Sequence, residues 1–104
     1  MSETALVKSV LQALALEPGV TAWRCNSGRR GRVTFGLGVG AADVIAIVAP
    51  LGRLCALECK VAGGTQREDQ KTWQRAVQSR GGVYALVHSV DEARRAIREA
   101  RRMA

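Results

Sequence analysis

The chain has 104 residues, 47% of them hydrophobic and 24% charged, which is typical of one small globular domain. Its 16 Lys and Arg against 9 Asp and Glu leave a net charge of +7. We therefore expect a polyanionic partner, most often nucleic acid. No apolar run reaches transmembrane length, and three cysteines without a C-x-x-C pair exclude a disulfide framework. Without a secretory leader, the sequence predicts a single domain over 1–104 in the cytoplasm, with no membrane partner.

A helix is predicted first, followed by a strand and a long loop. Ser2 is a candidate N-cap, apolar residues then recur at helical spacing as far as Leu14, and Pro18-Gly19 ends the run. Residues 20–25 predict a short strand. The glycine-rich, basic stretch "NSGRRGRVTFGLGVGAA" that follows predicts a loop with a few extended residues. A loop of this length in a small domain usually serves a function.

Two apolar segments, 43–49 and 54–61, predict a hairpin because the turn sequence "PLGR" separates them. Thr65 and Glu68 then have the spacing of a capping box, which predicts a helix over about 66–80.

The remaining segments predict one more strand and one more helix. "VYALVH" is the strand, and Ser89 with Glu92 repeats the capping-box spacing before a helix with an alanine-rich face. The order helix, strand, hairpin, helix, strand, helix predicts an α/β fold, with a mixed sheet flanked by helices.

The hairpin brings charged residues together. If Ala49 pairs with Leu54, then Asp43 lies opposite Lys60, and Glu58 is its diagonal neighbour on the same face at roughly 7–8 Å. Two carboxylates so placed can share a divalent cation, and a neighbouring lysine can orient or deprotonate an attacking water. The alternative is an ordinary solvated pair on the wet face of the sheet, because short motifs often occur by chance.

The helix after the hairpin adds a polar residue to this face. Gln66, Gln70, Trp73 and Val77 form one stripe at helical spacing. With Trp73 and Val77 packed on the sheet, Gln70 would face the carboxylates. It would then either orient a phosphate or be a satisfied residue at the edge of the core.

These residues resemble a known family. "GAADVIAIVAPLGRLCALECKVAGGTQREDQ" is similar to the core of PD-(D/E)xK nucleases. Together with "WRCNSG" and "GGVYALVHSVDEA", nearly the whole chain resembles virus-type replication-repair nuclease (VRR-NUC) domains, especially the small stand-alone domains of phages and prophages. Ala42 departs from the pattern, which has proline before the aspartate. The resemblance implies a restriction-endonuclease-like core with the order α-β-β-β-α-β-α.

The resemblance also implies an activity: an endonuclease that hydrolyses DNA phosphodiesters with Mg²⁺ or Mn²⁺. The implied catalytic residues are Asp43, Glu58, Lys60 and Gln70. The implied metal ligands are Asp43, Glu58, the main-chain carbonyl of Cys59 and, from the first helix, Glu3.

Two groups of arginines have different expected roles. Those of the long loop lie next to the expected metal site, so we expect them to contact DNA phosphates; with the asparagine of "WRCNSG", this group is Arg24, Asn26, Arg29, Arg30 and Arg32. The arginines of the last helix favour a solvated face, since cations are stabilised near a helix C-terminus. The glycine-rich loop lacks G-K-[ST] and a following helix, so we expect no nucleotide cofactor.

Several functions remain open. The enzyme could cut branched DNA such as Holliday junctions, and a domain this small would then act as a homodimer with two active sites, in a bacterial or phage-infected cell. It could instead be a nicking or flap-type nuclease. A basic DNA-binding module without turnover is the third alternative, although the presence of Asp43, Glu58 and Lys60 together favours an enzyme.

Overall fold

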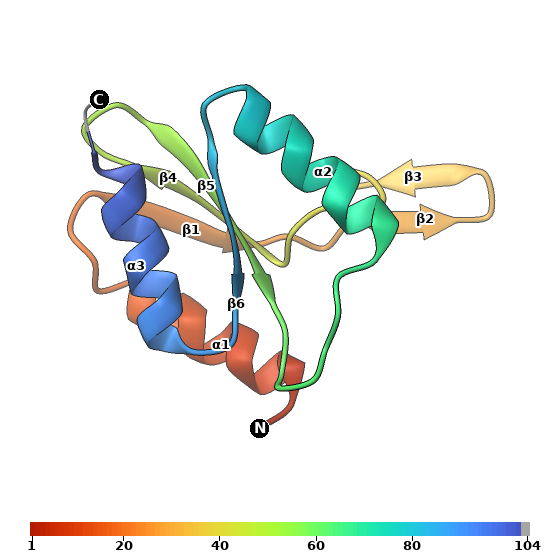
Figure 1. Cartoon of the computed structure of the whole chain (residues 1–104), viewed down its shortest axis with the longest axis horizontal. Coiled ribbons are helices and arrows are strands. Elements are labelled where there is room, and N and C mark those ends of the chain that lie inside the picture. Colours follow the sequence, from red (N-terminus) through yellow and green to blue (C-terminus); the bar gives the residue numbers. More distant parts are fainter. Residues whose placement is uncertain (103–104) are drawn as a thin grey trace.

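The structure is a computed structural model that describes residues 1–102. A four-stranded mixed sheet carries helices on both faces (Figure 1), which confirms the expected α/β fold. The elements are α1 (Glu3–Leu14), β1 (Val20–Arg24), β2 (Gly28–Arg30), β3 (Val33–Phe35), β4 (Val44–Val48), β5 (Arg53–Cys59), α2 (Glu68–Ser79), β6 (Val83–Val87) and α3 (Val90–Ala100). In the described part of the chain, no helix is long and apolar enough to cross a membrane.

The strands of the main sheet lie in the order β1-β4-β5-β6. β1, β4 and β5 pair antiparallel, as the expected hairpin requires. β6 pairs parallel to β5, because α2 connects the two strands as a crossover. The start of β4 and the end of β5 therefore lie side by side in the middle of the sheet, next to the start of α2.

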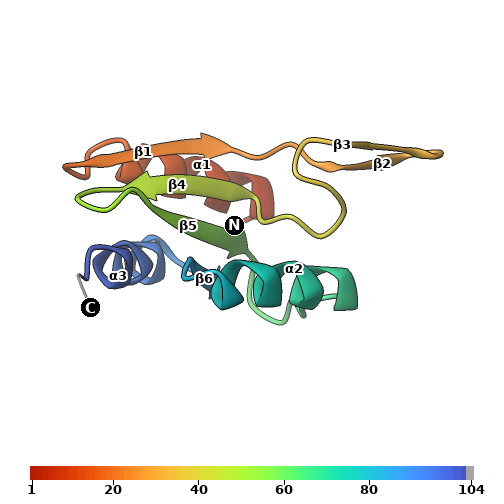
Figure 2. The same ribbon diagram turned by 90° about the horizontal axis from the view of Figure 1, so that it is seen from above.

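Each face of the sheet has its own core. On one face, α1 and α3 pack against the buried residues of β4 and β5, including Val44 and Leu57. On the other face, α2 covers a smaller cluster that contains Ile45, Val77 and Tyr84. Figure 2 shows α3 and α2 beside different parts of the sheet. The alternation of side chains along β4 and β5 divides their residues between the two cores.

The helix caps follow the sequence at both ends of the chain. Ser2 Oγ accepts a hydrogen bond of 3.0 Å from the Ala5 N–H, and Ser89 Oγ accepts one of 3.2 Å from the Glu92 N–H. These contacts satisfy N–H groups that the first turn of a helix leaves without partners.

The predicted start of α2 is wrong by two residues. The helix begins at Glu68 with Arg67 as N-cap, not near residue 66 with Thr65 as the cap. Gln70 Oε1 accepts a hydrogen bond of 2.9 Å from the Arg67 N–H. The buried Gln70 side chain thus does the capping, and the exposed Thr65 is not needed.

The predicted hairpin register is also wrong, by two residues. Ile47, not Ala49, pairs with Leu54, because the turn at Pro50 is longer than expected. One step beyond the pairing of Val44 with Leu57, Asp43 comes level with Glu58 rather than Lys60. A shift of two residues leaves every side chain on its expected face, since side chains alternate with a period of two.

The long loop contains a second sheet. β2 and β3 form a two-stranded antiparallel hairpin, joined by Gly31 and Arg32. Gly31 has a φ of +60°, as the first position of a tight hairpin turn often requires. The molecule measures 39 × 32 × 21 Å along its principal axes, and the hairpin projects along the longest of them (Figure 1). Five of the six strand residues of the hairpin are exposed.

Candidate active site

A cavity of about 640 Å³ opens where β4 begins and β5 ends, beside the start of α2. Its lining includes the four expected catalytic residues, Asp43, Glu58, Lys60 and Gln70. It also includes Glu3, Arg24, Asn26, Arg29 and Arg67. Residues that lie up to 67 positions apart in the chain therefore meet at one site.

Asp43 is held by the backbone on both of its sides. Its carbonyl oxygen accepts a hydrogen bond of 2.7 Å from the Cys25 N–H, which extends the pairing of β1 with β4. Its Oδ2 accepts one of 2.9 Å from the Cys59 N–H. The aspartate side chain thus takes the place of a backbone partner at the end of β5, which fixes it next to Glu58.

Glu58 is buried, with only 3% of its surface exposed, so the alternative of a solvated pair on a wet face is wrong: α2 covers this side of the sheet. Burial, hydrogen bonding to Asp43 and the charge of Asp43 raise the pKa of Glu58 from 4.5 to about 8, while Lys60 and Arg67 oppose the shift. Glu58 Oε1 has no hydrogen-bond partner among residues 1–102. A buried carboxylate oxygen without a donor is costly unless a proton or a cation compensates it.

Lys60 is 8% exposed and lines the same cavity. Its backbone N–H donates a hydrogen bond of 3.0 Å to the Val87 carbonyl, so the lysine continues the pairing of β5 with β6. The turn after it folds back: the Gly64 N–H bonds to the Val61 carbonyl, and a Cβ added at Gly64 would lie 3.4 Å from Lys60 Cβ and Cδ. The backbone at Gly64 therefore lies close beside the aliphatic part of the Lys60 side chain, where a larger residue would crowd it.

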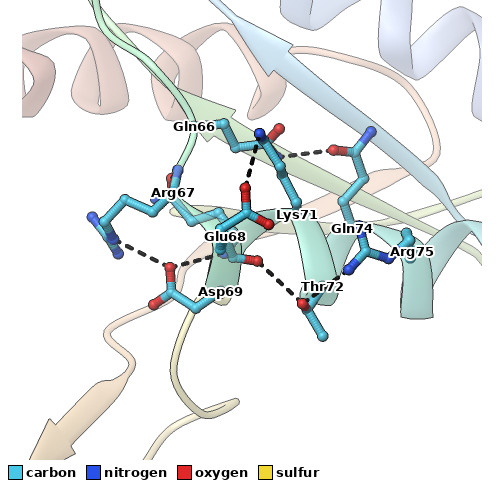
Figure 3. Close-up of polar contacts among 9 residues, drawn as sticks. Gln66, Arg67, Glu68, Asp69, Lys71, Thr72, Gln74 and Arg75 are labelled. Atoms are coloured by element: carbon cyan, nitrogen blue, oxygen red, sulfur yellow. Dashed lines mark hydrogen bonds and ion pairs between the residues drawn. The ribbon is translucent and has the colours of Figure 1, made fainter.

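Polar contacts hold the start of α2 (Figure 3). Arg67 Nε lies 3.2 Å from Asp69 Oδ1, Gln66 Nε2 donates to Gln74 Oε1 at 2.9 Å, and Lys71 Nζ lies 3.2 Å from Glu68 Oε1. Gln70 is 4% exposed, and its oxygen is used by the cap. Its amide N–H groups are the part left for the cavity.

The glycine-rich loop is packed on α2. A Cβ added at Gly40 would clash with the Asp69 carbonyl oxygen, and the indole N–H of Trp73 donates to the Leu37 carbonyl at 3.3 Å. These contacts hold the loop against the helix that carries Gln70.

The loop residues expected to contact DNA separate into two groups. Arg24, Asn26 and Arg29 line the cavity. Arg30 lines a different hollow, on the other face of the β2–β3 hairpin, and Arg32 lies in the hairpin turn. The positions of the first three suit contacts to phosphates on either side of a bond held in the cavity.

Three of the five arginines in α3 and directly after it form ion pairs within the chain. Arg94 lies 3.8 Å from Glu17 and 3.7 Å from Asp91, Arg101 lies 3.1 Å from Glu17, and Arg102 pairs with Glu99 at 2.9 Å. These ion pairs agree with the expectation that this helix presents an ordinary charged face.

The residues present fit a hard divalent cation. Mg²⁺ takes one or two carboxylates and completes its shell with water and substrate oxygens, and Asp43 with the unpartnered Glu58 oxygen offers such a pair. Over residues 1–102, no group of three or more His, Cys, Asp and Glu side chains is arranged to hold a metal ion. Glu3 lines the cavity without completing such a group.

Sequence reasoning missed Arg67, which lines the cavity and whose charge opposes the rise in the pKa of Glu58. A basic residue three positions before Gln70 was a usable signal, because Arg67 is the N-cap and Gln70 lies in the first turn once the helix is placed to start at Glu68.

Comparisons with known proteins support the fold. No model of a known protein family matches the chain, and no curated protein matches it. A solved structure described as "VRR_NUC domain" superimposes with a TM-score of 0.58 at 21% identity, covering 92% of this chain and 90% of that chain. The chain therefore has the fold of that domain, which confirms the expected resemblance at the level of architecture.

Proposed function

We propose that the protein is a metal-dependent nuclease that hydrolyses phosphodiester bonds of DNA. The observation that carries the proposal is the convergence of Asp43, Glu58, Lys60 and Gln70 on one cavity. The buried, unpartnered oxygen of Glu58 supports a cation at this position, and the likeness to a "VRR_NUC domain" supports nuclease chemistry.

The ligands of the cation would be Asp43, Glu58 and the carbonyl of Cys59. The Cys59 N–H bonds to Asp43, and the N–H and C=O of one strand residue point to the same side. Glu3, at the start of α1, would bind through water. Bound Mg²⁺ or Mn²⁺ would polarise the scissile phosphate and lower the pKa of an attacking water.

The other cavity residues have separate tasks. The Lys60 ammonium would offset phosphate charge and orient the attacking water. The Gln70 amide would donate to a phosphate oxygen. Arg24 and Arg29 would hold the neighbouring phosphates, and Asn26 would contact the same strand.

We further propose that the protein acts in the cytoplasm as a homodimer on branched DNA. Its three cysteines are free thiols, which suits a reducing compartment. Trp23 and Ile47, 49% and 44% exposed, lie on the sheet face beside α2, and Leu51 in the adjoining turn is 59% exposed. This apolar surface suits a second copy of the chain, and sedimentation of wild type and Trp23→Ser would test it.

The deciding experiment compares cleavage of linear, flap and four-way DNA with and without Mg²⁺ or Mn²⁺. Wild type should cut only with the cation, and Glu58→Ala and Lys60→Ala should cut at least 100-fold more slowly, since each removes a group at the reacting phosphate. Preferential cutting of flaps would instead identify a flap nuclease. Binding without any cutting would identify a DNA-binding module.

A further inference from the structure

The β2–β3 hairpin has two chemically different faces. Gly28 pairs with Phe35, Arg29 with Thr34, and Arg30 with Val33. Because neighbouring residues of a strand point to opposite faces, Arg29 and Thr34 share one face. Arg30, Val33 and Phe35 share the other.

Each face lines its own hollow. Arg29 lines the candidate active site. The opposite face contributes to a hollow of about 510 Å³ lined by Asn26, Arg30, Val33 and Phe35. Asn26 lines both hollows, so the second one lies directly beside the first, around the base of the hairpin.

The Phe35 side chain is held in place yet remains accessible. A Cβ added at Gly28 would lie 3.2 Å from Phe35 Cζ, so the ring lies across the glycine on the neighbouring strand. It is still 41% exposed, and Val33 is 67% exposed. An apolar patch on a projecting hairpin, away from both cores, favours contact with a partner over packing within the chain.

The charge around the patch favours a polyanionic partner. Residues 18–42 contain four arginines and no Asp or Glu. Within residues 1–102 none of these four arginines is in an ion pair, whereas three arginines of α3 and its end are. The hairpin is therefore basic surface with its charge available.

We infer that the hollow beside Phe35 binds one unpaired nucleobase of the DNA strand that enters the active site, an inference that rests on the proposed function. The aromatic ring offers a surface for base stacking. The Asn26 amide can donate to and accept from a base edge, and Arg30 can bind the adjoining phosphate. A base inside a duplex is stacked on both faces, so only an unpaired base can reach the ring.

The test uses three DNAs of one sequence, with Ca²⁺ in place of Mg²⁺ to limit cleavage. They are a perfect duplex, the duplex with one extra unpaired nucleotide, and the latter with that nucleotide abasic. Wild type should bind the second about tenfold more tightly than the first, from one base–aromatic stack. The abasic nucleotide should remove this gain.

The variants Phe35→Ala and Phe35→Leu should both lose the gain while binding the perfect duplex within about twofold of wild type, since the phosphate contacts remain. Leu16→Ala, 83% exposed outside the hairpin, should behave as wild type. Phe35→Leu keeps apolar volume without an aromatic face, so it separates stacking from support of the hairpin. Thermal melting checks that both variants fold.

Equal affinity of wild type for the three DNAs, or a gain that survives in Phe35→Leu, would overturn the inference. Cleavage in Mg²⁺ separates it from the proposed function. A wild type that shows the Phe35-dependent gain but cuts no DNA has the base site and is no nuclease. A wild type that cuts without the gain is a nuclease without the base site.

Discussion

The backbone N–H of Arg67 donates a hydrogen bond of 2.9 Å to the side-chain oxygen of Gln70, so a residue of the candidate active site also caps the helix that carries it. The two ends of one amide group have different tasks. Its oxygen stabilises the first turn of α2, and its N–H groups remain for the cavity. Stability and catalysis should therefore respond differently to different substitutions of Gln70.

Gln70→Ala should lower both the cleavage rate and the free energy of unfolding, the latter by about 1 kcal/mol, as for loss of a capping contact. Gln70→Glu keeps an oxygen at the cap, where a carboxylate is favourable, and removes the N–H donors. Its melting temperature should stay near that of wild type while its single-turnover rate falls. A wild-type rate for Gln70→Glu would show that the amide donors take no part in cleavage.

Glu58 predicts a pH-dependent stability of the metal-free protein. Because its pKa rises from 4.5 to about 8 on folding, the folded chain retains a proton that the unfolded chain has lost between these values. This contribution to stability is full below pH 4.5, falls as the pH rises to about 8, and is absent above it. Urea unfolding in EDTA should thus give a lower stability at pH 9 than at pH 6.

Glu58→Gln should reduce this loss and be more stable than wild type at pH 9 in EDTA, since it buries no charge. Mg²⁺ should raise the melting temperature of wild type at pH 9 but not that of the variant. The matched control is Glu68→Gln, an exposed residue of α2, which should keep the wild-type dependence. If the stability of Glu58→Gln depends on pH in the same way as that of wild type, the buried proton is not on Glu58.

The hairpin arginines should carry the salt dependence of DNA binding. Arg29→Ala with Arg30→Ala should weaken binding to all sequences and flatten the plot of log affinity against log salt by a slope of about 0.9 per lost duplex phosphate contact. The control is Arg95→Ala with Arg98→Ala on the exposed part of α3. If the control changes the slope and the hairpin variant does not, the DNA path runs over α3.

Gly40 should be far less tolerant of alanine than Gly38, although both have a positive φ, +87° and +90°. Alanine at Gly38 meets nothing within 4 Å, whereas at Gly40 it would meet the Asp69 carbonyl. Gly38→Ala should lower the free energy of unfolding only by the strain of a left-handed backbone, about 1–2 kcal/mol. Gly40→Ala should cost more and also slow cleavage by displacing the start of α2, as urea unfolding and single-turnover rates would show.

The grouping of the acidic and basic residues could be predicted because it depends on local alternation. The register estimate was off by two residues, yet Asp43, Glu58 and Lys60 still share a face, since only an odd shift moves a side chain across a strand. The burial of Glu58 could not be predicted in the same way. It depends on how closely α2 covers the sheet, which is a tertiary contact that no short pattern contains.

The β2–β3 hairpin was harder to predict than the main sheet for a related reason. Strands in a core show apolar residues at alternate positions, whereas five of the six residues of β2 and β3 are exposed. Only the glycine of the turn and the apolar end of "VTF" distinguish it from a loop. The start of α2 was misplaced because Thr65 had the right side chain for a cap, while Gln70 had the buried position.

The hydrogen bond from the Trp73 indole to the Leu37 carbonyl gives the protein a built-in optical reporter. Indole emission depends on the polarity and hydrogen bonding of its surroundings, and this indole is attached to the loop that follows the hairpin. The chain has a single other tryptophan, Trp23, so Trp23→Phe would leave one tryptophan, beside the glycine-rich loop. Its emission could then follow the arrival of DNA in real time, without a dye on either molecule.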